Sequence, residues 1–234
     1  MQLSYQQIQI ADTIARRNPN YFLNGRTQQK YFLLNYTYIF DRRDNRQYAL
    51  KGYRVSFDAT KSGLLPSDNI NLFSLSASYS YYFKIQGKFY ANYSLRGRVS
   101  FPEKQPFLQT QGLGYRNDLV RGYELYVIDG QSYGLLKTNA KYQLFDRVFD
   151  LKRFLKVKQF NTLPVAAYLN AFLDVGYARN NFPKLNNTIL GNRELVGGGI
   201  GLDVVSWYNV VGRLNYSING LAEKRLFLNL SREF

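Results

Sequence analysis

The chain has 234 residues, a formal net charge of +15, 17% aromatic residues, and neither cysteine nor histidine. The lack of both side chains excludes disulfides and thiol metal sites and removes the commonest general base, so we expect no enzyme activity, no cofactor and no metal site. Mean hydropathy is −0.36, and no apolar run approaches the roughly 18 residues that a membrane-spanning helix needs.

The positive charge could indicate a nucleic-acid partner. The lysines and arginines, however, are scattered along the chain and do not form one stripe, so we expect no such partner. Composition does not break anywhere, which predicts a single domain over residues 1–234.

Segments of alternating apolar and polar residues recur along the sequence, and each has the length of a strand. No helical pattern has comparable strength. The segments predict about ten strands, at residues 3–15, 28–40, 47–60, 69–83, 88–101, 131–145, 163–178, 193–206, 208–219 and 224–234.

This alternation fits a soluble β-sandwich as well as a membrane barrel, because both have one apolar face. Three features favour an all-β, transmembrane antiparallel β-barrel. The predicted strands are longer than the usual length of roughly five or six residues. The apolar face carries tyrosine and phenylalanine, and short connections alternate with long ones. The connection 146–162 breaks the alternation. Its basic residues fit either a membrane surface or an extended solvated turn.

An arginine lies in the long loop 102–130, within the run Val120-Arg121-Gly122-Tyr123-Glu124. This run resembles the Val-Arg-Gly-aromatic motif of the outer-membrane protein assembly factor family, which includes the BamA-type and TamA-type insertases and is also called the bacterial surface antigen barrel. Two further matches follow in order. Phe172-Leu-Asp-Val-Gly176 resembles the family's Phe-x-Asp-x-Gly strand, and Gly199-Ile-Gly201-Leu-Asp203 resembles its glycine-rich strand.

The resemblance implies a family barrel of roughly sixteen strands. About five strand-like segments follow the loop, the number that the family places between this loop and its end. We therefore expect residues 1–234 to form the C-terminal part of such a barrel, because an open sheet in lipid would leave unpaired edges.

The resemblance also implies that loop 102–130 folds into the lumen and that Arg121 meets acidic residues on the inner wall. If the apolar neighbours of Asp174 and Asp203 face lipid, both carboxylates face inward. We expect Arg121 to pair with one of them; alternatively, both are wet lumen residues and Arg121 is a surface charge. The inward glycines of 197–201 either make room for the loop or bend the strand.

Gly122 is expected to allow a tight turn, and Tyr123 and Glu124 to seat the loop. At the other end, the last strand alternates and resembles the signal by which new outer-membrane proteins are recognised, although Arg232 departs from that pattern. The alternative is simply a last barrel strand. The residues concerned are Leu226, Leu228, Leu230 and Phe234.

The resemblance implies a protein of the bacterial outer membrane that inserts or translocates other proteins at a seam between the first and last strands. Its partners would be the lipid bilayer, client outer-membrane proteins, and periplasmic proteins or lipoproteins. One alternative is the barrel anchor of a fused patatin-like lipase. Another is a passive, anion-preferring, porin-like channel with a basic lumen formed by Arg96, Arg98, Lys137, Lys141 and Arg213.

Overall fold

The computed structural model describes residues 1–115, 118–150, 162–182, 189–206 and 210–231. Almost all of the regular structure in these ranges is strand. The elements in chain order are β1 (Gln2–Gln9), α1 (Asp12–Arg17), β2 (Gln28–Asp41), β3 (Gly52–Ser62), β4 (Leu72–Gln86), β5 (Phe89–Phe101), η1 (Phe107–Gln109), β6 (Gln111–Leu113), β7 (Ile128–Asp129), β8 (Ser132–Asp150), β9 (Thr162–Arg179), β10 (Glu194–Val205), β11 (Val211–Asn219) and β12 (Lys224–Ser231).

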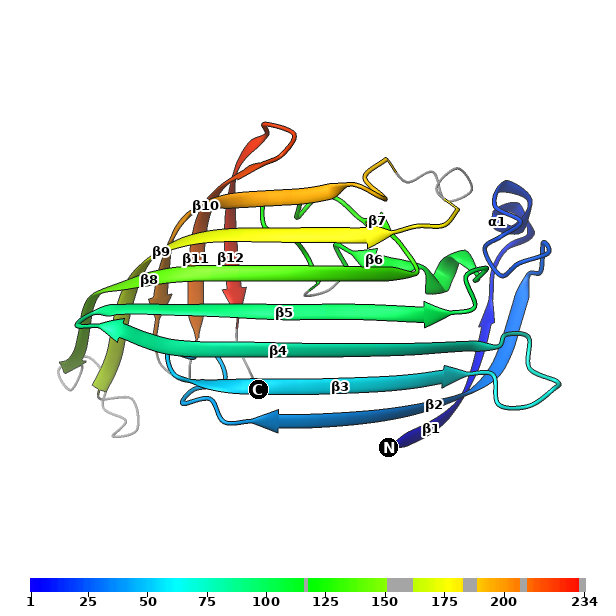
Figure 1. The fold of residues 1–234 in the computed structure, drawn as a ribbon, viewed down its shortest axis with the longest axis horizontal. Helices are drawn as coiled ribbons and strands as arrows, with labels where there is room; N and C mark the ends of the chain where they lie inside the picture. The colour runs from blue at the N-terminus through cyan, green and yellow to red at the C-terminus, as the bar shows by residue number, and fades with distance from the viewer. Residues whose placement is uncertain (116–117, 151–161, 183–188, 207–209, 232–234) are drawn as a thin grey trace.

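Ten of these strands form one antiparallel sheet in the order β1-β2-β3-β4-β5-β8-β9-β10-β11-β12. The sheet is a curved meander: β4, β5, β8 and β9 run across the front of the view, and β11 and β12 run behind them at a steep angle (Figure 1). Within the described ranges, β1 and β12 are its two edges. The predicted fold class is confirmed as a partial β-barrel.

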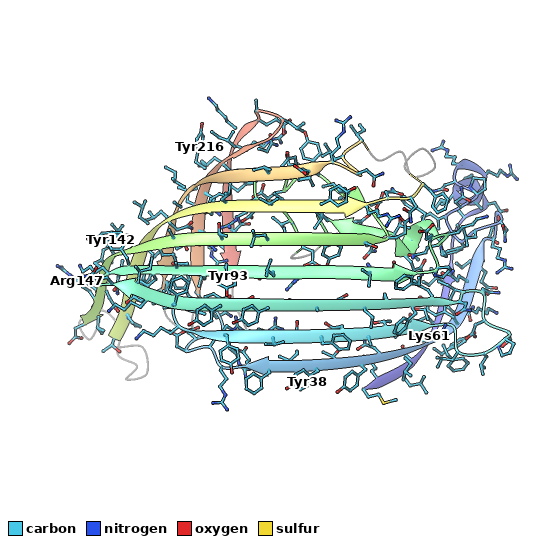
Figure 2. All side chains as sticks on the ribbon, in the orientation of Figure 1. Tyr38, Lys61, Tyr93, Tyr142, Arg147 and Tyr216 are labelled. Carbon is cyan, nitrogen blue, oxygen red and sulfur yellow. The ribbon has the colours of Figure 1, made fainter. Side chains whose placement is uncertain are left out.

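The two faces of the sheet differ in polarity, as the alternation predicts. On β9, Leu169 and Leu173 are about half exposed, whereas Asn170 and Asp174 on the other face are buried. The outer face carries many exposed aromatic side chains, among them Tyr38, Tyr142 and Tyr216 (Figure 2). The inner, concave face is polar or glycine-rich. In the part of the chain that the structure describes, no helix has the length and apolar character required to cross a bilayer.

One end of the sheet, called the short-turn end, has the short β4–β5 and β10–β11 turns, and the other, called the long-loop end, has the longest connections together with the short β11–β12 turn. At the short-turn end, the expectation that residues 146–162 form a connection was wrong at both limits. The ladder continues past a bulge at Gln143/Phe145, so that Asp146 pairs with Ala166 and Asp150 pairs with Thr162. Pairing therefore extends both strands, and the basic residues 152, 153, 156 and 158 lie outside the described residues.

Two predicted strands were too long at one end. The end of the segment 3–15, from Asp12, belongs to α1, which continues to Arg17; Asp12 lies in its first turn and Arg16 and Arg17 lie in its last, the arrangement that the helix dipole favours. The segment 47–60 begins as a strand only at Gly52, which has a φ of +101°. The preceding residues form a turn that folds toward the inner face.

Candidate functional site

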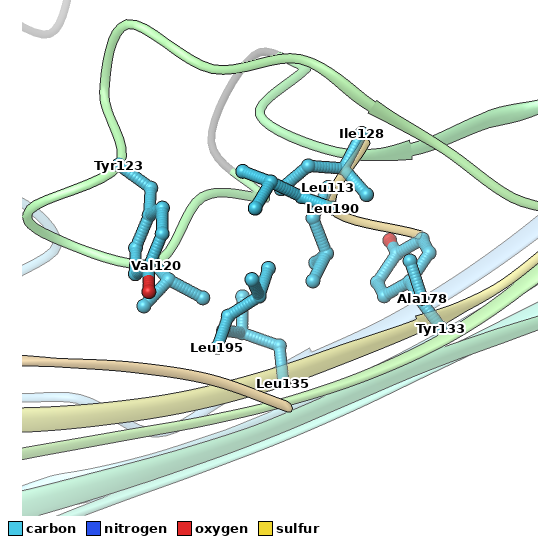
Figure 3. Close-up of a cluster of buried hydrophobic side chains, with 9 residues drawn as sticks. All are labelled: Leu113, Val120, Tyr123, Ile128, Tyr133, Leu135, Ala178, Leu190 and Leu195. Atoms are coloured by element: carbon cyan, nitrogen blue, oxygen red, sulfur yellow. The ribbon is translucent and has the colours of Figure 1, made fainter. Parts of the chain in front are cut away.

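Loop 102–130 leaves β5, forms η1 and the β6–β7 pair, and lies against the inner face of the sheet. A cluster of buried apolar side chains joins the loop to the wall (Figure 3). Burial of such side chains holds the loop to the wall independently of its charges. The loop contributes Leu113, Val120, Tyr123 and Ile128, and β8, β9, β10 and the segment before β10 contribute Tyr133, Leu135, Ala178, Leu190 and Leu195.

Arg121 is seated on Asp174 at the centre of this contact. Its Nε donates to Asp174 Oδ2 at 2.8 Å, and its second guanidinium nitrogen donates to Asp174 Oδ1. The backbone N–H of Arg121 also donates to Oδ2, at 3.1 Å. The Asp174 side chain is 0% exposed and that of Arg121 is 14% exposed. The pair is thus the buried, bidentate, charge-assisted arrangement for which arginine is suited.

The remaining contacts of Arg121 come from the neighbouring ladder positions. Its Nη1 donates to Asn139 Oδ1 at 2.5 Å, and its Nη2, which also bonds Asp174, donates to the Thr138 carbonyl at 3.1 Å. The guanidinium carbon lies 4.0 Å from the centre of the Phe172 ring, a cation–π contact. Asn139 and Phe172 are cross-strand partners, so the register of β8 on β9 builds the site.

Glycines make room for the loop at two wall positions. A Cβ on Gly176 would lie 2.5 Å from Val120 Cγ2, and a Cβ on Gly197 would overlap the Arg121 carbonyl oxygen. Gly197 is the cross-strand partner of Asp174, so the missing side chain and the carboxylate are adjacent. Gly197 thus admits the loop backbone and Gly176 admits the loop side chain of Val120, at distances that a Cβ on either would not allow.

Gly199 and Gly201 serve neighbours other than the loop. A Cβ on Gly199 would meet the Tyr216 carbonyl and would lie 2.9 Å from Phe172 Cζ, while one on Gly201 would meet the Asn215 side chain. Gly199 thereby lets the Phe172 ring, and the guanidinium stacked on it, lie over β10. Of the three alternating glycines Gly197, Gly199 and Gly201, it is therefore Gly197 that makes room for the loop.

The rest of the motif connects the loop to the turn between β11 and β12. Gly122 has a φ of +95°, and its carbonyl accepts from Asn219 Nδ2 at 2.9 Å. The Tyr123 hydroxyl accepts from the Gly220 N–H at 3.1 Å. Glu124 accepts from the Gly122 N–H at 2.7 Å, and burial raises the pKa of its carboxyl.

Tyr126, just beyond the motif, adds a further bond to the same turn. Its hydroxyl donates to Glu223 at 2.8 Å. Asn219 also donates to Glu223, at 2.9 Å, and this hydrogen bond lowers the pKa of the Glu223 carboxyl. The loop is therefore bonded both to the middle of the wall and to the last hairpin of the sheet.

The structure places Asp203 in a second polar cluster and not beside Arg121. Asp203 is 1% exposed and accepts from the Tyr48 hydroxyl at 2.9 Å and from Asn170 Nδ2 at 3.1 Å. The contact of Tyr48 with Asp203 is not predicted from the sequence, because the alternation of residues 47–60 predicts one continuous strand. The Asp44-Asn45 pair before it, a common turn former, was the available signal.

Three of the five cations proposed for a basic lumen, Arg96, Arg98 and Lys141, contact neighbouring groups. Arg96 forms an ion pair with Asp118 of the loop, and Arg98 donates to the carbonyls of Gln111 and Gln109, at 2.9 and 3.2 Å. Lys141 lies 3.9 Å from the centre of the Tyr48 ring. The first two of these cations hold the loop.

The last strand presents its leucines outward. Leu226, Leu228 and Leu230 are 65%, 71% and 76% exposed, while Phe234, named with them as a terminal signal, lies outside the described residues. Across the described ranges no group of three or more histidine, cysteine, aspartate or glutamate side chains could hold a metal ion.

Comparison with known proteins gives the family. A sequence model of the Omp85 superfamily domain matches residues 1–214, while no curated protein matches the chain. The superfamily comprises outer-membrane β-barrel proteins of the BamA and TamA type, concerned with assembly and translocation of proteins, and its members are generally not enzymes. The match covers most of the sheet and the whole of the arginine loop, and the chain belongs to the Omp85 superfamily.

Proposed function

We propose that this chain is the barrel part of an assembly factor in the bacterial outer membrane, which inserts or translocates client proteins beside its last strand, β12. Superfamily membership supports the class of activity. The observation that carries the proposal for this chain is the seating of Arg121 on the fully buried Asp174, because a loop that merely met water would need no such site.

The contacts of the loop link it to the proposed working edge. Asn219 and Gly220 bond the loop at the end of β11, and Glu223 bonds it just before β12. A strand at the edge of a sheet offers its backbone N–H and C=O groups to an incoming strand. The position of the loop and the availability of β12 are therefore coupled through one turn.

The outer face supports the proposed location. Its exposed leucines and aromatics fit the apolar band and aromatic girdles of outer-membrane barrels. We propose client outer-membrane proteins, with periplasmic proteins or lipoproteins, as partners. A passive anion channel is less well supported, because Arg96 and Arg98 bind the loop.

A charge swap tests the role of the arginine site. In cells that depend on the variant protein, Arg121→Glu should lower the amount of folded client barrel in the outer membrane, and Arg121→Glu with Asp174→Arg should partly restore it. The matched control is the same swap at the exposed pair Glu103 and Arg179, whose Oε1 and Nη2 atoms lie 3.9 Å apart. This control swap should leave the amount of folded client barrel unchanged. Normal client levels with correctly inserted Arg121→Glu protein would overturn the proposal.

A further inference from the structure

The turn between β2 and β3, residues 42–51, is organised by its own side chains. Asn45 Oδ1 accepts from the backbone N–H groups of Gln47 and Tyr48, at 2.8 and 3.2 Å, and Asp44 Oδ1 accepts from that of Leu50 at 3.0 Å. Such bonds fix a turn without help from a sheet. The turn is therefore a built element that directs Tyr48 away from solvent, and Tyr48 is 4% exposed.

On the inner wall, side chains from four strands surround Tyr48. Asp203 of β10 accepts its hydroxyl, and the ring of Tyr168 on β9 lies 4.8 Å away between centres. Lys141 of β8 and Arg213 of β11 place cations 3.9 and 6.0 Å from the Tyr48 ring centre. Tyr48 and Asp203 are 155 positions apart in sequence. The turn thus joins the two halves of the sheet across the concave face.

The location of this contact is opposite to that of the arginine loop. The turn connects β2 to β3 at the short-turn end, whereas loop 102–130 enters from the long-loop end. The two inward carboxylates are divided between them: Asp174 binds the loop and Asp203 binds the turn.

We propose that residues 42–51 form a clasp, held by Tyr48 on Asp203, that fastens the β2–β3 turn to the inner wall at the short-turn end independently of the arginine loop. This inference concerns the attachment of the turn to the wall and stands whether or not the protein assembles clients. The Asp203 carboxylate, which is 1% exposed, would meet water from this end only when Tyr48 withdraws.

Cysteine labelling tests the clasp, because the chain has no native cysteine. Ala49→Cys, at a buried position, and Lys51→Cys, at an exposed position of the same turn, are compared in the intact protein in proteoliposomes with a polar maleimide. In the native background Ala49→Cys should react at least about tenfold more slowly, as expected for a site that is reached only by local opening. Equal rates would mean that the turn is not inserted, and would overturn the proposal.

Second-site variants identify what holds the clasp. Tyr48→Phe removes one hydrogen bond to a charged group and should speed the labelling of Ala49→Cys by roughly tenfold to a hundredfold; Tyr48→Ala should bring it to the rate of Lys51→Cys. Tyr38→Phe, on the outer face, is the control and should leave the rate unchanged. If labelling with Tyr48→Phe stays slow, Tyr48 does not hold the turn, and this result needs no variant that disrupts packing.

Discussion

Replacement of Arg121 by leucine is the perturbation that most directly measures the arginine site. It would leave the Asp174 carboxylate, which is 0% exposed, with only the backbone N–H of residue 121 as its donor from the loop. Removing one partner of a buried ion pair costs about 3–5 kcal/mol. We expect this cost to appear as a weaker attachment of the loop.

Hydrogen–deuterium exchange of the loop amides reports that attachment. Exchange through local opening is faster in proportion to the opening equilibrium, so a loss of about 3–5 kcal/mol corresponds to roughly 10² to 10⁴-fold faster exchange at residues 118–126. The amides of the β3–β4 ladder should not change. Mass spectrometry of the protein in detergent micelles would resolve both regions.

Two variants decide whether the ion pair is the cause. Arg121→Leu combined with Asp174→Leu removes the buried carboxylate together with the guanidinium and should exchange more slowly than Arg121→Leu alone, since the aspartate is no longer left without its partner. Arg179→Leu breaks the exposed pair with Glu103, at 3.9 Å, and should cost about 0–1 kcal/mol. A stabilising role for the ion pair is refuted if Arg121→Leu changes loop exchange by less than about tenfold, or if the loop exchanges faster in the double variant than in Arg121→Leu.

Two further substitutions test the glycine wall and a pH-dependent loop. Gly197→Ala should release the loop, because its Cβ would overlap the Arg121 carbonyl, whereas Gly134→Ala, the control, has no atom within 4 Å of its Cβ. Hydrogen–deuterium exchange of the loop compares the two variants, and equal exchange rates would count against close contact between the loop and Gly197. Asp68 accepts backbone N–H groups at the β3–β4 loop, led by that of Leu65, and these bonds lower its pKa. The folded-state pKa lies below the unfolded value of about 3.9, so the stabilisation by Asp68 is present above the unfolded pKa and is lost as pH falls through the folded pKa. Asp68→Asn should remove this acid-dependent loss of stability from unfolding curves measured against pH. Curves that do not change would contradict the stabilising role of Asp68.

The strands were predictable because each one alternates, and a period of two turns successive residues to opposite faces. The same rule turns Asp174 toward the inner face between Leu173 and Val175, where the structure has it. Element ends were less predictable. Pairing carried β8 on to Asp150, and no local pattern marked that limit.

The partners of the site could not be read from sequence to the same extent. Whether Asp174 or Asp203 meets Arg121 depends on how far the loop reaches along the wall, and loop length alone does not fix this. Tyr48 was missed because an alternating segment can continue into a turn whose side chains, here Asp44 and Asn45, redirect the backbone. Short-range patterns contain no information about a contact 155 positions away.

The two carboxylates lie on adjacent strands, Asp174 on β9 and Asp203 on β10, and each is tied to an element from a different end of the sheet. Sliding β9 along β10 by one residue would turn every side chain of the moving strand to the opposite face, and would carry its aspartate out of its pocket. The β9–β10 ladder is thus pinned against shear from both ends. A motion that opened the barrel without breaking these two contacts would therefore have to occur at other strand pairs.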